Sequence, residues 1–148
     1  MTAEETYLDP SALTRLYLHQ PGSAEMVKWR RRHSGPLTVT HHGRVEVVNA
    51  ISLACFRQEI SAEEAEKAWT YLDEDFANGL LVQADILWRA ALQHANELSR
   101  AHSPKLGSRS LDVLHVACAL ELKLRALLTF DERQRKLAVS VGLKPISL

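Results

Sequence analysis

The sequence predicts an α/β fold in which a central, mainly parallel sheet is flanked by helices. Short apolar or β-branched runs alternate along the chain with longer segments of helical periodicity, which is typical of β–α–β units. The run at residues 126–130 is strongly apolar, as expected for a strand that is covered on both faces of a parallel sheet. The 148 residues contain no internal repeat and no long linker, so we expect one domain over residues 1–148.

Turn and cap signals set the boundaries of these elements. The expected strands are 6–9, 37–40, 80–82, 126–130 and 144–148, and the expected helices are 11–19, 23–33, two between 43 and 79, 85–101, 111–124 and 131–141. Pro10 ends the first strand, and Pro21-Gly22 ends the helix that follows it. The capping box Ser61-x-x-Glu64 opens the second helix of the 43–79 pair. Pro104 and its neighbours predict a loop before the helix at 111–124.

Composition excludes several classes of protein. The 18 basic and 18 acidic residues give a net charge of zero, so no overall positive field attracts nucleic acid. No apolar stretch approaches the roughly 20 residues of a membrane span, and the acidic N-terminus does not resemble a signal peptide. Cys55 and Cys118 lie in apolar helical patterns and are expected to be free and buried. These features favour a cytoplasmic protein.

Asp9, Glu46 and Asp131 are expected near the carboxyl ends of the strands, where open α/β sheets bind their ligands. Asp112 reaches the same rim if its helix starts there. Each acid alone is explained by helix capping or by the helix dipole. Taken together, they would repel one another, at about 4 kcal/mol for a pair 4 Å apart at an effective dielectric near 20. Either protonation of some of the acids or a bound cation would relieve this repulsion. Oxygen-only ligands suit Mg²⁺ or Mn²⁺ and argue against zinc, and a water on such an ion can attack a phosphodiester.

Four segments of the chain resemble the motifs of PIN-domain ribonucleases, above all the VapC-type toxins of toxin–antitoxin systems. They are Tyr7-Leu-Asp-Pro-Ser-Ala-Leu13, Glu46-Val-Val-Asn49, Ser110-Leu-Asp-Val-Leu-His-Val-Ala117 and Leu128-Thr-Phe-Asp131. The match covers nearly the whole chain. Two departures concern the approach of substrate: Pro10 follows the first Asp where Thr or Ser is usual, and residues 40–45 lack the usual Ser/Thr-rich approach to the Glu.

The resemblance implies a single PIN-like domain with Mg²⁺- or Mn²⁺-dependent endoribonuclease activity toward structured RNA, often tRNA or ribosomal RNA. Carried over by position, the four acids would hold the metal and orient the attacking water, and Ser11 and Thr129 would support them. The resemblance further implies a homodimer that is inhibited by a cognate antitoxin, whose tail covers the acidic pocket. Ala50, Leu53 and the 11–18 helix offer an apolar face for such a dimer.

Several basic residues are candidates for RNA contact. Arg44, Lys105 and Arg109 lie close in sequence to the acids and are the best of them, whereas the basic run at 28–32 is typical of a solvated helix end. His41 and His42 are expected at a strand end, where neighbouring side chains point to opposite faces and cannot easily bind one ion; one of them near an RNA phosphate is an open alternative.

His115 shares a helical face with Asp112 and is expected to fill space or to orient that acid. Other classes of protein fit less well. A signalling receiver domain would need paired acids after the first strand, and an aspartyl phosphatase would need an acid at position 11, where this chain has Ser11. A non-catalytic PIN-like module that binds RNA or protein remains the alternative to a nuclease. It would bind without metal and would keep its affinity when Asp9 is neutralised.

Overall fold

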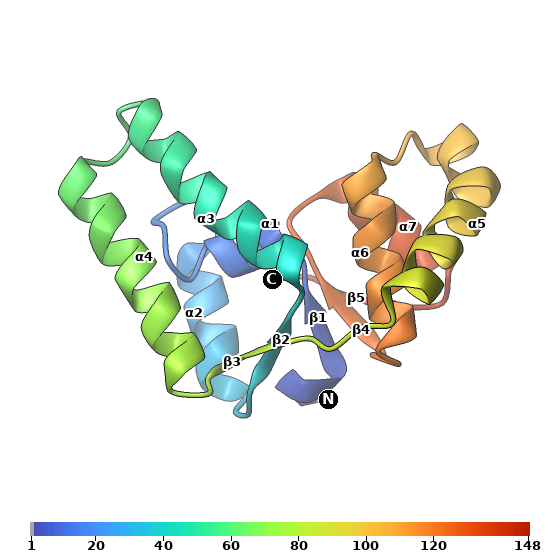
Figure 1. The fold of residues 1–148 in the computed structure, drawn as a ribbon, viewed down its shortest axis with the longest axis horizontal. Helices are drawn as coiled ribbons and strands as arrows, with labels where there is room; N and C mark the ends of the chain where they lie inside the picture. The colour runs from blue at the N-terminus through green and yellow to red at the C-terminus, as the bar shows by residue number, and fades with distance from the viewer. Residues whose placement is uncertain (1) are drawn as a thin grey trace.

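The computed structural model describes residues 2–148 as an α/β fold whose strands all pair in parallel. One sheet has the order β1-β4-β5 and a second pairs β2 with β3. The strands are β1 (Thr6–Leu8), β2 (Leu37–Val39), β3 (Leu81–Gln83), β4 (Ala126–Leu128) and β5 (Lys144–Ile146). β2 packs beside β1, so the two sheets lie next to each other in the centre of the molecule (Figure 1).

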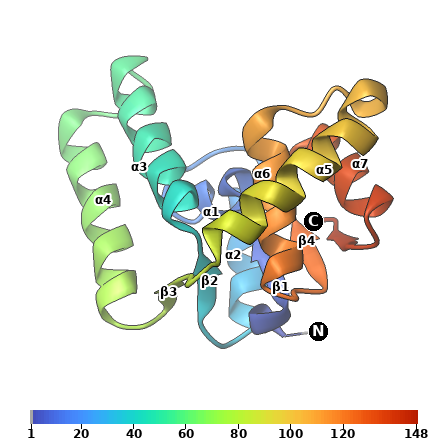
Figure 2. The same cartoon turned by 45° about the vertical axis from the view of Figure 1, so that its right-hand side comes forward.

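Helices cover the sheets from both sides. They are the short 3-10 helix η1 (Ala3–Glu5), α1 (Pro10–Thr14), α2 (Ser23–Arg32), α3 (His41–Phe56), α4 (Ala62–Ala77), α5 (Trp88–Leu106), α6 (Ser110–Glu121) and α7 (Glu132–Ser140). The α3–α4 hairpin stands on one side of the molecule, and α5, α6 and α7 pack together on the other (Figures 1 and 2). No helix within residues 2–148 combines the length and hydropathy that a membrane crossing requires.

Two hydrophobic cores lie on the two faces of the β1–β4 pair. Successive strand residues point to opposite faces, so Tyr7 and Leu127 join the core under α5, α6 and α7, whereas Leu8 and Leu128 join the core under α1 to α4. All four side chains are buried. The apolar run predicted as a doubly covered strand therefore has the predicted environment.

The structure corrects three predicted element boundaries. The helix predicted over 11–19 is regular only to Thr14 and continues as turns. α5 begins at Trp88 and runs through the loop predicted around Pro104, because a proline in a last turn removes only one hydrogen bond; Gly107, with a φ of +67°, ends the helix instead. α3 begins at His41, two residues before the predicted 43–79 segment.

Candidate active site

Asp9 lies directly after β1, and its carboxylate is held by three side chains. Its Oδ2 accepts hydrogen bonds from the hydroxyls of Ser11 at 2.7 Å and Thr129 at 3.0 Å, and its Oδ1 accepts one from Gln134 Nε2 at 3.3 Å. Only 6% of Asp9 is exposed. Asp9 occupies the residue before α1 but makes no side-chain capping bond. Helix capping therefore does not explain this carboxylate.

The two hydroxyls that hold Asp9 also fix the segment after β4. Ser11 Oγ accepts the Phe130 N–H at 3.0 Å, and Thr129 Oγ1 accepts the Asp131 N–H at 3.0 Å. The two hydroxyl oxygens lie 3.2 Å apart. The ends of β1 and β4, 120 residues apart in the chain, are thereby tied to one carboxylate. Ser11 and Thr129 thus lie against Asp9, and their support of a metal site stays a prediction.

Asp131 and Asp112 are joined through one arginine. Asp131 Oδ1 accepts the Arg133 N–H at 2.9 Å and caps α7, so the capping explanation holds for this acid. Its Oδ2 faces Arg109, whose Nη2 lies 3.4 Å away. Arg109 Nε also lies 3.6 Å from Asp112 Oδ2, in the first turn of α6. A guanidinium thus provides the positive charge between two of the four acids.

Glu46 comes from the second turn of α3 and is bound by His115 of α6. His115 Nε2 lies 2.5 Å from Glu46 Oε2, and the histidine is almost completely buried. His115 Nδ1 lies 2.6 Å from Tyr7 Oη, which lies 3.4 Å from Thr40 Oγ1. Burial raises the pKa of Tyr7 well above its usual range, so the phenol stays protonated as a hydrogen-bond donor. The prediction that His115 orients Asp112 is therefore wrong: it holds Glu46.

Two of the acids, Glu46 and Asp112, line an open pocket between α3 and the start of α6. A pocket of about 400 Å³ is lined by Glu46, Arg109, Ser110, Leu111 and Asp112. A neighbouring pocket shares Glu46 and Leu111 with it and extends to Ser11, which carries the hydrogen bond to Asp9. Asp9, Asp131 and Asp112 are thus linked through Ser11, Thr129 and Arg109, whereas Glu46 joins Asp112 only as a lining residue of the pocket.

The acids do not, however, close into one tight cluster. Within residues 2–148, the only group of three or more potential metal-ligating side chains with donor atoms inside 4.8 Å of one another is His42, Glu46 and His115. Sequence reasoning missed this group because it placed His42 at a strand end. Since α3 begins at His41, His42 and Glu46 are spaced i, i+4 on one helical face. The i, i+4 spacing of His42 and Glu46 was the feature of the sequence that could have predicted their proximity.

Both ring nitrogens of His42 are buried without a hydrogen-bond partner. Its ring centroid lies 4.4 Å from that of His115 and 5.6 Å from that of Trp88. Burial first, and then the neighbouring His115, lowers the pKa of His42 to about 4. The imidazole is therefore neutral near pH 7, which is the form that binds metal ions.

The predicted RNA-contact residues have different surroundings. Arg44 turns toward α4, with Nη2 3.0 Å from Asp73 Oδ1 and its guanidinium 4.0 Å over the Phe76 ring. Lys105 is exposed in the last turn of α5. Arg109 alone of the three lies among the acids. In the basic run, Arg30 donates to the carbonyls of His33 and Gly35 and so stabilises the end of α2.

Comparison with known families is consistent with this arrangement. The family model described as the PIN domain matches residues 6–140, which is most of the chain. PIN domains are commonly divalent-metal-dependent nucleases. No curated protein shows a significant match to the chain.

Proposed function

The chain belongs to the PIN-domain family, and we propose that it is an endoribonuclease that requires Mg²⁺ or Mn²⁺. The observation that carries the proposal is Asp9, a buried carboxylate that caps no helix, is oriented by three donors and lies next to Pro10 and Ser11, which line an open pocket. Burial of a carboxylate costs desolvation free energy, and buried acids that are held by several donors are typical of functional sites. We infer that the function of Asp9 is to bind a metal ion at this pocket.

The donor set fits a hard divalent ion. Asp9, Glu46, Asp112 and Asp131 would hold it, because carboxylate oxygens are the ligands that Mg²⁺ and Mn²⁺ prefer. When bound, such an ion supplies an activated water and neutralises charge on the scissile phosphate. Ser11 and Thr129 keep Asp9 Oδ2 in place for this role.

Basic side chains near the pocket are proposed to bind the phosphates of the RNA substrate. Arg109 neutralises Asp112 and Asp131, and it becomes available to an RNA phosphate once those acids bind an ion. Lys105 extends the basic side of the pocket rim through the α5–α6 connection. Arg44 is committed to Asp73, so we propose for it a weaker role in RNA binding.

We further propose that the protein acts as a VapC-type toxin against tRNA or ribosomal RNA, as a homodimer whose pocket is covered by an antitoxin. The exposed face of α3 supports the dimer: Val45, Val48 and Phe56 lie on one side of the helix, with Leu53 beside them. The open pocket that Glu46 and Asp112 line supports a site accessible to RNA and to an inhibitory peptide.

A non-catalytic binding module is the second candidate, and Arg109 favours it. An internal guanidinium already relieves the repulsion between Asp112 and Asp131, so these acids do not require a metal for stability. Under this alternative RNA binds equally well with EDTA and to Asp9→Asn.

Incubation of antitoxin-free protein with total RNA separates the two candidates. We expect discrete fragments with Mn²⁺ or Mg²⁺, none with EDTA, and at least a hundredfold slower cleavage by Asp9→Asn. Asp85→Asn is the matched control, because Asp85 is an exposed acid on the β3–α5 connection. Growth arrest on induction of the wild type but not of Asp9→Asn tests the toxin role. Metal-independent RNA binding without cleavage would favour the binding module.

A further inference from the structure

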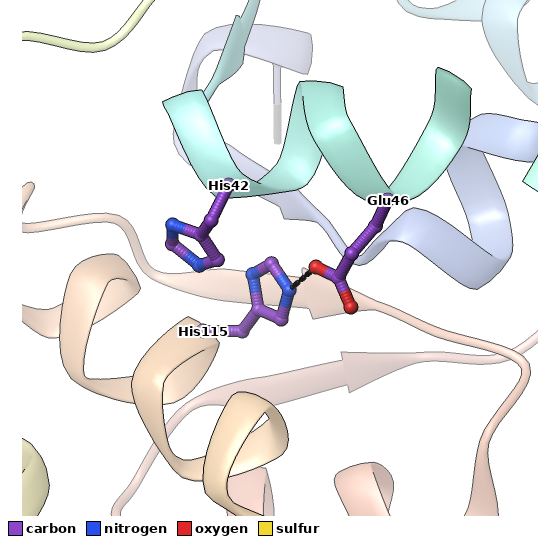
Figure 3. Close-up of side chains that lie close together, drawn as sticks. All are labelled: His42, Glu46 and His115. Carbon is purple, nitrogen blue, oxygen red and sulfur yellow. Dashed lines mark hydrogen bonds and ion pairs between the residues drawn. The ribbon is translucent and has the colours of Figure 1, made fainter. Parts of the chain in front are cut away.

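The structure points to a second type of metal site, and we propose that His42, Glu46 and His115 bind a divalent transition-metal ion such as Zn²⁺. Their donor atoms lie within 4.8 Å of one another. His42 and Glu46 project from neighbouring turns of α3, and His115 rises toward both from α6 (Figure 3). Three donors from two elements are thus gathered without a bound ion.

The nitrogens of His42 are the strongest sign of a missing ligand. Buried polar atoms almost always have hydrogen-bond partners, yet Nδ1 and Nε2 of this ring have none among the described residues 2–148. His42 is half-buried, and its ring packs on that of His115 with centroids 4.4 Å apart. A metal ion in the plane of the His42 ring would give one of these nitrogens a partner.

His115 is prepared for coordination by a chain of hydrogen bonds behind it. Tyr7 Oη lies 2.6 Å from His115 Nδ1 and 3.4 Å from Thr40 Oγ1, which accepts the Gly43 N–H at 3.0 Å. This chain fixes the ring so that Nε2 faces Glu46. Coordination through Nε2 requires the proton of the ring to lie on Nδ1, which then donates to Tyr7 Oη while the Tyr7 hydroxyl donates to Thr40 Oγ1. Metal-binding histidines commonly donate from their second nitrogen in this way, which sets the tautomer and the orientation of the ring.

The donor set selects the class of ion. Two imidazole nitrogens and one carboxylate oxygen suit Zn²⁺, Co²⁺ and Ni²⁺, whereas Mg²⁺ prefers oxygen ligands. At metal–ligand distances of about 2.0–2.2 Å, tetrahedral ligands lie roughly 3.4 Å apart. The donor atoms of His115 and Glu46, 2.5 Å apart, therefore need to open by roughly 1 Å, and the wider separations, all within 4.8 Å, need to close by at most about 1.4 Å. Three protein ligands leave a fourth position open to water.

Glu46 belongs both to this site and to the proposed carboxylate site, so the two ions compete for it. A transition-metal ion held by His42 and His115 draws Glu46 away from the other acids. On the basis of the proposed function, micromolar Zn²⁺ then inhibits the Mg²⁺-dependent nuclease. The chain would cleave RNA only when this site is free.

Binding is measured first, without RNA, on the full chain in excess Mg²⁺. We expect one equivalent of Co²⁺ to give visible absorption bands of an ion bound in low coordination, and Zn²⁺ to displace it. His42→Ala should weaken Co²⁺ binding at least tenfold, and His42→Asn should do the same. His41→Ala is the matched control, because His41 is the exposed neighbour on the same turn. Circular dichroism confirms that each variant is folded.

The outcomes separate this site from the nuclease. Absence of Co²⁺ binding by the wild type, or binding that His42→Ala leaves unchanged, would overturn the proposed site whether or not RNA is cleaved. Binding that depends on His42 supports the site even if no RNA is cleaved. Where cleavage occurs, His42→Ala should need at least tenfold more Zn²⁺ for half-inhibition than His41→Ala, and equal sensitivity would refute the competition for Glu46.

Discussion

Asp9 and Asp131 each precede a helix, yet only one of the two carboxylates caps it. Asp131 accepts the Arg133 N–H, whereas Asp9 accepts bonds only from the side chains of Ser11, Thr129 and Gln134. Two aspartates at equivalent positions before a helix therefore have different roles: Asp131 caps its helix and Asp9 does not. The difference is due to Ser11 and Thr129, whose hydroxyls bind the Asp9 carboxylate in place of a backbone N–H of α1.

Substitution of Arg109 tests whether its guanidinium competes with a metal ion for Asp112 and Asp131. Arg109→Ala removes the guanidinium between Asp112 and Asp131, so these carboxylates should bind a divalent ion more readily. We expect a severalfold lower half-saturating Mn²⁺ concentration in calorimetric titration without RNA. RNA affinity should fall severalfold, because a phosphate contact is lost.

Arg133→Ala is the control for this prediction, because Arg133 is exposed in the first turn of α7. It should leave the Mn²⁺ titration unchanged. Weaker Mn²⁺ binding by Arg109→Ala would show that the guanidinium organises the acids instead of competing with the ion.

His42 predicts a pH dependence of stability in metal-free protein. Its pKa of about 4 in the folded protein lies below the ordinary histidine value of 6.5, so the unfolded chain takes up a proton at a higher pH than the folded chain. This contribution is absent above pH 6.5 and destabilises the fold as the pH falls from 6.5 toward 4. Glu46, His41 and His115 also act on this ring.

Urea unfolding at several pH values in EDTA measures the effect. His42→Gln should lose stability less steeply than the wild type between pH 6.5 and pH 4, because it lacks the titrating ring. Parallel curves for the two proteins would mean that His42 does not titrate differently on folding.

At the scale of elements, the start of α3 decides which side chains meet. Thr40 caps this helix by accepting the Gly43 N–H, and the cap sets the phase in which His42 and Glu46 face α6. Gly43 permits the tight turn: a Cβ there would lie 2.8 Å from Thr40 Oγ1. One hydroxyl therefore links the β2–α3 connection to the geometry of the site.

Thr40→Val removes this hydroxyl while keeping the shape of the side chain. We expect a loss of about 1–2 kcal/mol in the free energy of unfolding, the usual cost of a lost N-cap, together with slower RNA cleavage because Glu46 shifts. Thr40→Ser keeps the hydroxyl and should stay close to the wild type in both measurements. Urea unfolding and the RNA assay test this pair, and equal stability of the two variants would refute the role of the cap.

At the scale of the whole molecule, the exposed face of α3 predicts self-association. Val45 is 66% exposed and Phe56 is 83% exposed, which is unusual for large apolar side chains on one helix. We expect a dimer in sedimentation analysis. Phe56→Asp should shift it toward monomer at micromolar concentration, because the substitution places a charge in an apolar interface.

Leu148→Asp serves as the control for this prediction, since Leu148 is also an exposed apolar residue but lies at the C-terminus. It should leave the sedimentation behaviour unchanged. A monomeric wild type, or equal effects of the two substitutions, would contradict the proposed interface.

The sequence by itself determined the fold class and the parallel pairing of the sheet. Alternating strand and helix signals, and an apolar run buried on both faces at β4, follow from local periodicity and hydrophobicity, which act within a few residues. Strand ends in a parallel sheet share one edge, and this rule predicted that Asp9, Glu46 and Asp131 lie near one another, whereas Ser11 and Thr129 were implied only by the resemblance to PIN-domain ribonucleases.

Only the tertiary structure decided the partners of those acids. Asp131 is bound by Arg109, 22 residues away along the chain, and Glu46 by His115, 69 residues away. Asp9 is bound by Thr129, 120 residues away. Sequence periodicity says which face a side chain occupies but not what lies across from it. His42 shows the limit most clearly: a two-residue difference in where α3 begins places its ring beside Glu46 and His115. Helix ends depend on cap contacts, and side-chain partners depend on packing between distant elements.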